Sequence, residues 1–480
     1  MTDVSYLAIA PELLLLVGAV AVLMVDVFLH PQPRVHGWIA AVTFAAVGVA
    51  IGGQWHRVGT DGVGISFGGT LFLHNLSVSA RIMLLVVAVL GTVTAWEMLV
   101  GLGRRMAEGI SLVLVSTAGF MLMGASADLV MVFVALEVGS IALYVLAGIV
   151  RNSTAGDEAA MKYFLLGAFA SAIFIYGGAL AYAGTGTTNL VEAGGVLDAY
   201  HVARPAVLLI GMALLVVGMG FKVTAAPFHS WAPDVYQGAP AGVVGFMAAA
   251  AKVGGFAALI NILIIGFDRY QRAWADGLAI LAAVSVVFGT LLAIQQSDVR
   301  RMLAYSGVAH AGFILTGITA GLAGTDGVLF YLATYSVMLV GAFAAVTAVS
   351  GPASSGSAFD DYRGLGRRSP VVAAVLATLM IAMSGMPLTT GFIGKFQVFS
   401  AAWDAGYGWL VIVGLLSSVA AFFFYLRLVV LMYFRSGDGS GAEWAPALHV
   451  RGVLLASTAL TIAFGVFPGP LMDLLTRAGG

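Results

Sequence analysis

Four ionisable side chains lie inside long apolar stretches of the sequence. Glu137 and Lys252 each lie midway along such a stretch, Lys222 lies within a third, and Lys395 lies towards the end of a fourth. Burying an ionisable group in a membrane costs free energy, so we interpret its presence there as a sign of function. These residue types predict a proton relay, although structural ion pairs or side chains that reach the membrane surface are the simpler alternative.

Lysine suits proton transfer for a physical reason. Burial disfavours its charged form, and a nearby carboxylate opposes that effect. A lysine beside Glu137 would therefore hold its proton while the carboxylate is close and release it when the carboxylate moves away.

Helix-breaking residues accompany two of these lysines. Lys222 opens the segment KVTAAPFHSWAP, in which Pro227 lacks a backbone N–H and should interrupt the helix. We expect the freed carbonyl groups and Thr224 to line a cavity beside Lys222. Pro387 precedes Lys395 in MPLTTGFIGK, which repeats the arrangement. Two interrupted helices that each carry a lysine are typical of a transport site near the middle of the membrane.

Further residues are candidates for a secondary relay. A histidine titrates in the useful pH range, although a lone histidine in a membrane is more often hydrogen-bonded structure. Lys162 follows Glu158 by four residues, so an ion pair at the membrane surface explains it equally well. The candidates for secondary roles are Lys162, His229, Tyr305 and His310.

The composition indicates a membrane protein without its own redox centre. Of 480 residues, 60% are hydrophobic and only 9% are charged, whereas soluble domains carry about 25% charged residues. There is no cysteine, which excludes disulfides and cysteine-held iron–sulfur clusters. No motif for a dinucleotide or for ATP phosphates is present, and the net charge of −1 disfavours nucleic acid as a partner. We also predict no metal site.

Apolar runs long enough to span a bilayer recur along the whole chain, and only helices satisfy the backbone of so apolar a sequence. The sequence therefore predicts an all-α integral membrane protein of about fourteen transmembrane helices. The expected spans are 5–29, 36–53, 75–100, 108–124, 127–150, 158–184, 203–235, 239–265, 274–295, 300–320, 325–350, 370–403, 407–434 and 448–475.

The basic residues in the connections predict the orientation. If both termini lie outside, ten arginines fall in inside loops and four in outside loops, as cytoplasmic loops prefer. The four outside residues are Arg57, Arg204, Arg269 and Arg272. A weak internal repeat aligns the segment from 135 with the segment from 304, and the expected topology runs the two segments in opposite directions.

At these residues the sequence resembles the antiporter-like membrane subunits of respiratory complex I, most closely the N-type subunits of bacterial NADH–quinone oxidoreductase. The resemblance extends over nearly the whole chain, from the opening APELLLL onward. M-type subunits carry a glutamate where Lys395 stands, which argues against that sibling. The segments that carry the resemblance are EAAMKYFLLGAFASA from 158 to 172, FKVTAAPFHSWAPDVYQGAP, AYSGVAHAGF, DDYRGLGRRSP and GMPLTTGFIGKF.

The resemblance implies fourteen helices with two inverted five-helix repeats and broken seventh and twelfth helices. The expected domains are three N-terminal helices (1–104), a first antiporter-like half (105–270), a second half (271–440) and a C-terminal helix (441–480). The resemblance also implies that Glu137 and Lys222 form the coupling pair, that Lys252 is the central relay and that Lys395 leads to the outer face.

The expected function is that of a proton-translocating subunit in a bacterial inner membrane. NADH, FMN, iron–sulfur clusters and quinone would reside in partner subunits, and the membrane partners would include further antiporter-like subunits and small subunits. One alternative is a subunit of a multisubunit Na⁺/H⁺ antiporter, which co-purification would distinguish. A second alternative is a structural membrane spacer, for which changes at Glu137 and Lys222 would leave proton pumping intact.

Overall fold

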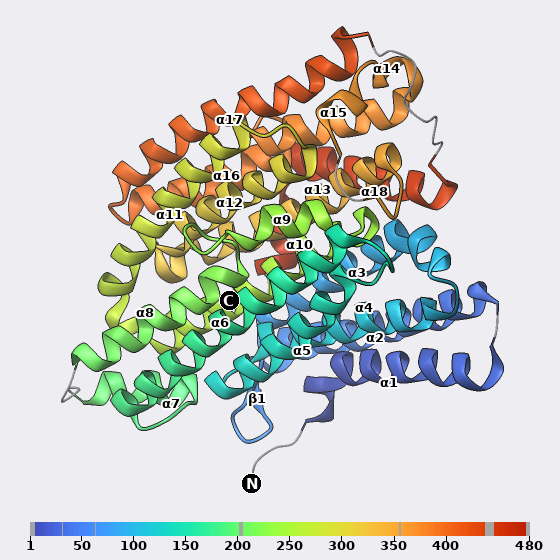
Figure 1. Ribbon diagram of the computed structural model, residues 1–480. Helices are drawn as coiled ribbons and strands as arrows, with labels where there is room; N and C mark the ends of the chain where they lie inside the picture. Colours follow the sequence, from blue (N-terminus) through green and yellow to red (C-terminus); the bar gives the residue numbers. More distant parts are fainter. Residues whose placement is uncertain are drawn as a thin grey trace.

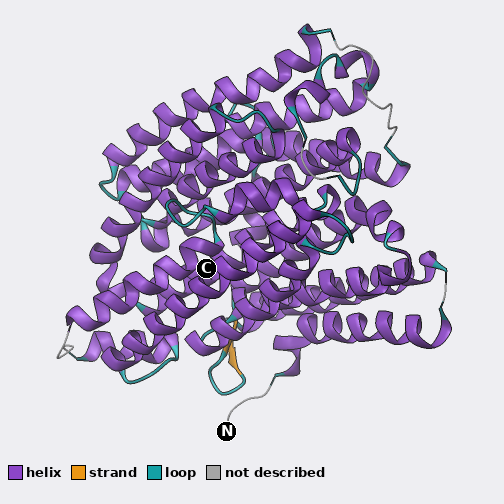
Figure 2. Ribbon diagram, viewed as in Figure 1, coloured by secondary structure: helices purple, strands orange, loops and turns teal. Residues whose placement is uncertain are grey.

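The computed structural model describes residues 5–30, 32–62, 64–200, 205–354, 357–436 and 446–476. Long helices lie side by side across the molecule, with α1 and α17 at opposite edges (Figure 1). Helix makes up nearly all of the described chain, apart from loops and one small hairpin at an end of the bundle (Figure 2). This architecture confirms the predicted all-α class. Arg204 and the predicted domain boundary at 440/441 lie outside the described residues.

The N-terminal part holds three long helices and the hairpin. Pro33 begins α2, where its missing N–H costs no hydrogen bond. The antiparallel hairpin between α2 and α3 was not predicted, and its second strand bridges to Ser126 after α4. The elements are α1 (Tyr6–Leu29), α2 (Pro33–Asp61), β1 (Gly64–Ser66), β2 (Leu71–Leu73) and α3 (Asn75–Gly101).

The middle of the chain forms the next group of helices. A short helix that was not predicted, α7, lies in the connection between α6 and α8. The elements are η1 (Gly103–Arg105), α4 (Met106–Ala125), α5 (Leu129–Ala147), α6 (Thr154–Thr185), α7 (Leu190–Ala199), α8 (Pro205–Lys222), α9 (Trp231–Gly238), α10 (Ala241–Ile260) and its continuation η2 (Asn261–Gly266).

The C-terminal part repeats the pattern of long helices with one interruption. Its elements are η3 (Asp268–Tyr270), α11 (Gln271–Ile294), α12 (Val299–Ile318), η4 (Gly321–Gly324), α13 (Thr325–Ser350), η5 (Phe359–Tyr362), α14 (Leu365–Arg368), α15 (Pro370–Ser384), α16 (Thr390–Asp404), α17 (Gly408–Phe434), α18 (Leu448–Val466) and α19 (Gly469–Thr476).

The predicted spans agree with the helices except at interruptions. Within the described residues, twelve helices are long and apolar enough to cross a membrane. The predicted span 203–235 is divided into α8 and α9, and the span 370–403 into α15 and α16, which confirms both predicted breaks. The prediction of one helix over 448–475 was wrong, because the chain leaves the helix at Phe467 and Pro468 before α19. The total of fourteen spans stays a prediction.

Two central helices hold the bundle together. In their most apolar stretches, 89% of the residues of α10 and 94% of those of α13 are buried, far more than in α1 or α17. α10 packs against α3, α4 and α13. Because Lys252 is carried by α10, it lies at the centre of the molecule, away from any lipid-facing surface.

Two aspartates begin their helices in the same way. Asp128 accepts hydrogen bonds at 2.8 and 3.3 Å from the N–H groups two and three residues further along α5. Asp298 does the same at 2.9 and 3.0 Å at the start of α12. Each also pairs through its backbone with a distant loop, at Asn189 and Ala358 respectively. This matched geometry supports the predicted repeat, whose inversion across the membrane stays a prediction.

A buried ion pair joins α1 to α3. The Nε of Arg81 donates to Glu12 at 2.8 Å, and a second guanidinium nitrogen of Arg81 donates to the carbonyl of Ala8, also at 2.8 Å. Pro11 cannot bond to the carbonyl of Leu7, which accepts instead from Gln54 of α2 at 2.7 Å. The first three helices are therefore fixed to one another by polar groups that lipid cannot replace.

Replacing Arg81 with methionine is expected to destabilise the N-terminal helices by about 3–5 kcal/mol, because Glu12 would keep a buried charge without its partner. Denaturant titration of the purified assembly, followed by protease sensitivity of residues 5–62, measures the effect. The double variant Glu12→Gln, Arg81→Met removes both charges and should recover part of the loss. Equal instability of the single and double variants would show that the pair's charge is not the cause.

Candidate functional site

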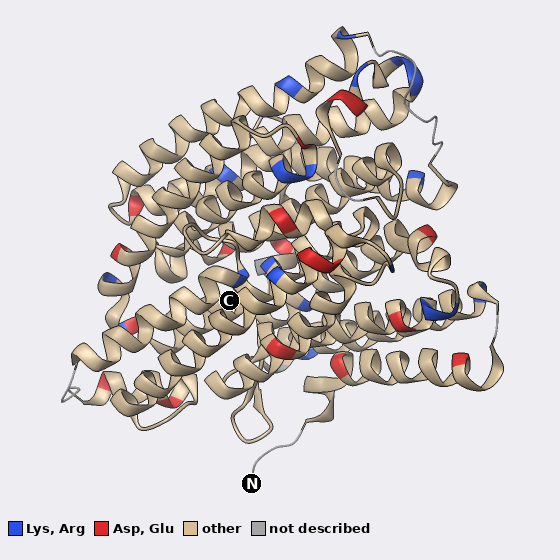
Figure 3. Cartoon of the chain, viewed as in Figure 1, with Lys and Arg blue, Asp and Glu red and all other residues tan. Residues whose placement is uncertain are grey.

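Lysine is used sparingly in this chain. Only four of the 22 basic residues are lysines: Lys162, Lys222, Lys252 and Lys395. Three of them are buried, with exposed fractions of 1% for Lys222, 1% for Lys252 and 5% for Lys395. Charged residues are sparse along the helices as a whole (Figure 3). Arginine stays charged under all ordinary conditions, whereas lysine gives up a proton when its surroundings change.

Lys222 is the last residue of α8, directly before the break. The chain then passes through turns that contain Pro227 and re-enters a helix at Trp231. The Nζ of Lys222 donates to the hydroxyl of Ser140 at 2.7 Å and to that of Tyr163 at 3.4 Å. Hydroxyl groups and aromatic rings therefore surround this ammonium group.

Glu137 lies on α5, one turn from the serine that binds Lys222. Its carboxylate accepts a hydrogen bond from Ser171 of α6. Among the described side chains, Glu137 and Lys222 form no direct ion pair, and they interact through space only. The structure thus brings the predicted pair close together but has the carboxylate withdrawn from the ammonium group.

Lys252 binds the backbone that the break in α8 exposes. Its Nζ donates to the carbonyl of Val223 at 3.1 Å and to the hydroxyl of Thr224. Thr224 itself has a positive φ of 63°, a conformation that threonine seldom adopts. We expected the freed carbonyl groups and Thr224 to line a cavity beside Lys222, and that cavity stays a prediction. In the structure, the carbonyl of Val223 and the hydroxyl of Thr224 bind Lys252, because α10 packs against α8 at this level.

Lys395 lies on α16, shortly after the second helix break. Its Nζ donates to the carbonyls of Met383 at 3.2 Å and Ser384 at 2.9 Å, and to the hydroxyl of Ser418 on α17 at 2.6 Å. The last carbonyls of α15 have no partner within their own helix, and they carry the negative end of its dipole. Gly385 adopts φ 95° directly after them, which turns the chain towards α16. The broken helix therefore provides a binding site for the ammonium group.

His310 of α12 lies near both Lys252 and Lys395. Its ring nitrogens contact two tyrosine hydroxyls, that of Tyr331 at 2.9 Å and that of Tyr425 at 3.1 Å. His310 interacts electrostatically with both lysines. Hydroxyl groups both donate and accept, so this cluster has the chemistry to pass a proton between them.

The remaining secondary candidates are less closely integrated. His229 lies in the break of α8, with its ring 5.9 Å from that of Tyr305 and its Nδ1 buried without a hydrogen-bond partner. Lys162 is 41% exposed and contacts Glu158 and Asp234, each at 2.6 Å. Asp234 also pairs with Arg301 of α12 at 2.6 Å. The structure thus places Lys162 in a surface network, apart from the three buried lysines.

Several residues of the site carried no signal in the sequence. Tyr335 stacks on His310 at 4.4 Å, and its buried hydroxyl has no hydrogen-bond partner. Ser306 bonds to Tyr425, which lies 115 residues from His310 in the chain. Tyrosine and serine are ordinary residues in membrane helices, so only packing reveals that these gather around one histidine.

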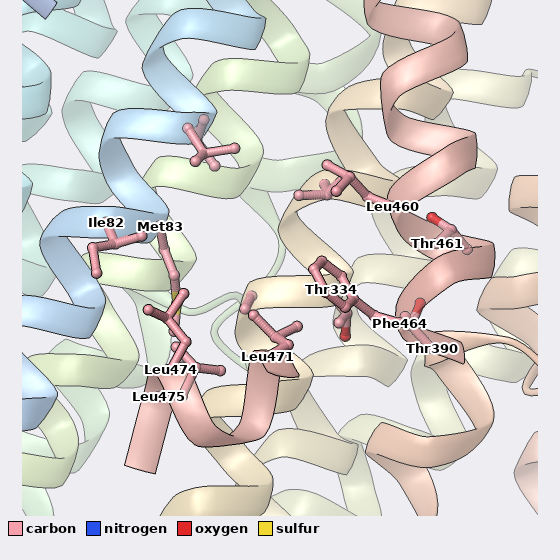
Figure 4. A pocket seen from close by; sticks show the side chains of 14 residues that line it. Ile82, Met83, Thr334, Thr390, Leu460, Thr461, Phe464, Leu471, Leu474 and Leu475 are labelled. Atoms are coloured by element: carbon pink, nitrogen blue, oxygen red, sulfur yellow. The ribbon is translucent and has the colours of Figure 1, made fainter. Parts of the chain in front are cut away.

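Two cavities in the protein differ in the side chains that line them. One of about 430 Å³ opens beside Lys395 between α15, α16 and α17. Another, of about 190 Å³, lies between α3, α13, α16, α18 and α19, where side chains such as Met83, Leu460 and Leu471 form an apolar wall (Figure 4). No ionisable residue lines it. Within the described residues, no group of His, Asp and Glu is arranged to hold a metal ion.

Comparison with known proteins gives a consistent picture. The family described as "NADH:quinone oxidoreductase/Mrp antiporter, TM" matches residues 126–421. The NADH-quinone oxidoreductase subunit N of Trichlorobacter lovleyi is 38% identical over 472 residues, which cover 98% of this chain and 96% of that protein.

Solved structures agree with these relatives. A chain of respiratory complex I from Thermus thermophilus with bound aureothin is 32% identical, with a TM-score of 0.83 over 98% of this chain and 100% of that one. A chain of the Mrp complex from Dietzia sp. DQ12-45-1b has a TM-score of 0.81 at 21% identity, over 99% of this chain and 97% of that one. At that identity the second likeness concerns the fold alone.

Proposed function

This chain belongs to the family of NADH-quinone oxidoreductase subunit N, and from that membership we propose that it is a proton-translocating membrane subunit of such an enzyme. Electrons pass from NADH to quinone in partner subunits, which hold the FMN and iron–sulfur clusters. This chain takes up the released free energy as a change in the charge and spacing of Glu137 and Lys222.

The proton path that we propose follows the buried groups. A proton enters from the inner side near α8 and α10, with Lys162 and His229 as secondary groups. It passes from Lys222 to Lys252, and then through His310, with Tyr305 beside the path, to Lys395. Lys395 delivers it towards the outer face.

One observation supports this proposal more strongly than any other. Lys222 and Lys252 share the same short piece of broken backbone, since Lys222 ends α8 and Lys252 bonds to the next two residues, Val223 and Thr224. A shift of Lys222 towards Glu137 must therefore disturb the hydrogen bonds that hold Lys252. Sites are coupled in this way when both bias one element that has two arrangements.

The wider arrangement is proposed on the same basis. We assign the chain to a bacterial inner membrane with both termini outside, and we divide it at 104, 270 and 440 into three N-terminal helices, two antiporter-like halves and a C-terminal helix. The matched caps of Asp128 and Asp298 support the two halves. The partners are other membrane subunits of the complex, including further antiporter-like subunits and small subunits.

Co-purification tests the assignment against the Na⁺/H⁺ antiporter alternative, which the fold shared with the Mrp chain keeps open. An affinity tag on this chain, used in its native membrane, should recover subunits with NADH oxidation activity and bound FMN. Recovery of small antiporter subunits without flavin would reject the proposed function.

Replacing Lys395 with glutamate is expected to slow proton translocation about ten-fold or more without preventing assembly, because its partners all lie within this chain. A carboxylate cannot donate to the carbonyls of Met383 and Ser384 when it is ionised. Dye-monitored acidification of vesicles measures the rate, and Lys395→Gln serves as the uncharged comparison. Pumping at the normal rate in Lys395→Glu would show that the exit assignment is wrong.

A further inference from the structure

A groove on the outside of the bundle lies far from the relay, between α2, α3 and α18. It has a volume of about 400 Å³. Gly37, Ala41 and Phe44 line it from α2, Thr92 and Trp96 from α3, and His449 from α18. α2 and α18 both pack against α3, and the groove is the gap beside α3 that they leave. The start of α2, the end of α3 and the start of α18 meet at its mouth.

We propose that this groove binds a phospholipid of the inner leaflet, with the phosphate at its mouth and an acyl chain along its length. The orientation proposed above places the mouth on the inner side of the membrane. The groove runs along the helices for seven residues, from Gly37 to Phe44 and from Trp96 to Val89, which is about 10 Å.

The polarity of the residues that line the groove falls with depth, as the polarity of a phospholipid falls from its headgroup to its acyl chains. His449 lies at the mouth, and its Nε2 is buried without a hydrogen-bond partner. Thr92 lies one turn deeper, about 6 Å from the level of Trp96. Its side chain is only 7% exposed, and its hydroxyl also has no partner. Ala41 lies at about the same depth as Thr92, and below them Phe44 and Val89 are apolar.

The two unpartnered groups need explanation, because a threonine in a helix normally bonds to the carbonyl four residues before it, as Thr94 does at 2.8 Å. Both atoms are closed off in the structure, so each side chain must rotate before a glycerol ester at the depth of Thr92 accepts from its hydroxyl and a phosphate at the mouth accepts from His449. A ligand that is apolar throughout would leave both groups unsatisfied, which is unfavourable for a buried polar group.

The charges around the mouth also fit a phospholipid headgroup. Arg34 lies one turn before Gly37 on α2, is exposed and forms no ion pair among the described residues. The carboxylate of Asp26 lies 3.0 Å from the Nε2 of His36. Asp26 and Glu97, which follows Trp96, are acidic groups near the mouth, and they would favour a headgroup that also carries an ammonium. Trp96 has the ring type that prefers the headgroup level.

Photo-crosslinking in the intact complex tests the proposal. The complex is reconstituted in nanodiscs of phosphatidylethanolamine and phosphatidylglycerol that contain a trace of phosphatidylethanolamine with a diazirine on one acyl chain. We expect cross-linked peptides from residues 37–44 and 89–96. A diacylglycerol probe with the same acyl chain lacks the phosphate and should label them at least about five-fold less.

Matched variants separate the groove from general lipid contact. Ala41 is exposed on the groove wall, so Ala41→Trp should fill the groove without disturbing the core and lower labelling at least about five-fold. Val42 is 65% exposed and does not line the groove, so Val42→Trp should label normally. Arg34→Gln should reduce the difference between the phospholipid and diacylglycerol probes.

Three outcomes would overturn the proposal. Labelling that Ala41→Trp leaves unchanged would place the probe elsewhere. Equal labelling by both probes would mean that the mouth does not recognise phosphate. A photoreactive residue at position 41 that cross-links to another polypeptide, and not to lipid, would show that a partner subunit fills the groove.

Discussion

Replacing Lys252 with arginine is expected to reduce proton translocation by the assembled complex at least about a hundred-fold, although the positive charge remains. A relay group must release its proton, and arginine does not do so in proteins. Lys252→Met should fail to the same extent for the opposite reason, since it never binds a proton. Acidification of inverted vesicles on addition of NADH measures the rate.

The fourth lysine provides a matched control for this experiment. Lys162 is partly exposed and makes ion pairs with Glu158 and Asp234 that an arginine also makes. Lys162→Arg keeps these ion pairs, so it should lose much less pumping than Lys252→Arg, and any loss measures how far Lys162 itself relays protons. If Lys252→Arg pumped normally, Lys252 would be a fixed structural charge, and the relay would have to bypass the centre of the bundle.

The second large effect is expected at the coupling pair. Lys222→Ala and Glu137→Gln should each lower translocation at least about ten-fold, and the double variant should be little worse than either single variant. Residues that act as one unit are not additive, because removing either member already disables it. Glutamine keeps an oxygen that accepts from Ser171, so Glu137→Gln removes the charge with little change in packing.

Ser140→Ala is the control for this pair, because it removes a hydrogen bond to Lys222 but leaves both charges in place. Its effect should be clearly smaller than that of Glu137→Gln. Independent, multiplying losses in the double variant would contradict the coupled pair. Normal pumping in both single variants would favour a structural spacer.

The sequence predicted those features of the fold and the site that a single residue type determines. Charge within apolar stretches of the sequence identified Glu137 and the three buried lysines, and Pro227 and Pro387 predicted both broken helices because proline removes a backbone hydrogen bond. The same rule applied to Pro468 would have ended α18, but the apolar run continues beyond it and the prediction passed over the break. Hydrophobicity reports which segments are apolar, and it does not report where the helix stops.

The contacts within the site could not be predicted because they depend on packing between distant segments. No helix break accompanies Lys252 in the sequence. Its hydrogen-bond partners come from the end of α8, against which α10 packs. Tyr425 reaches His310 from α17, and nothing in its local sequence distinguishes it from other tyrosines. Pair interactions of this kind are properties of the fold, whereas the cost of a buried charge is a property of the residue.

We propose that protons cross the membrane on this chain's lysines while electrons pass through other subunits. The most direct test is proton translocation by proteoliposomes that contain the complex with Lys222, Lys252 and Lys395 all replaced by methionine. NADH oxidation by a soluble electron acceptor serves as the measure of assembled redox subunits. We expect normal oxidation by the soluble acceptor and a loss of NADH-driven proton translocation of at least about a hundred-fold. Translocation at the wild-type rate in this variant would show that the lysines do not carry the protons.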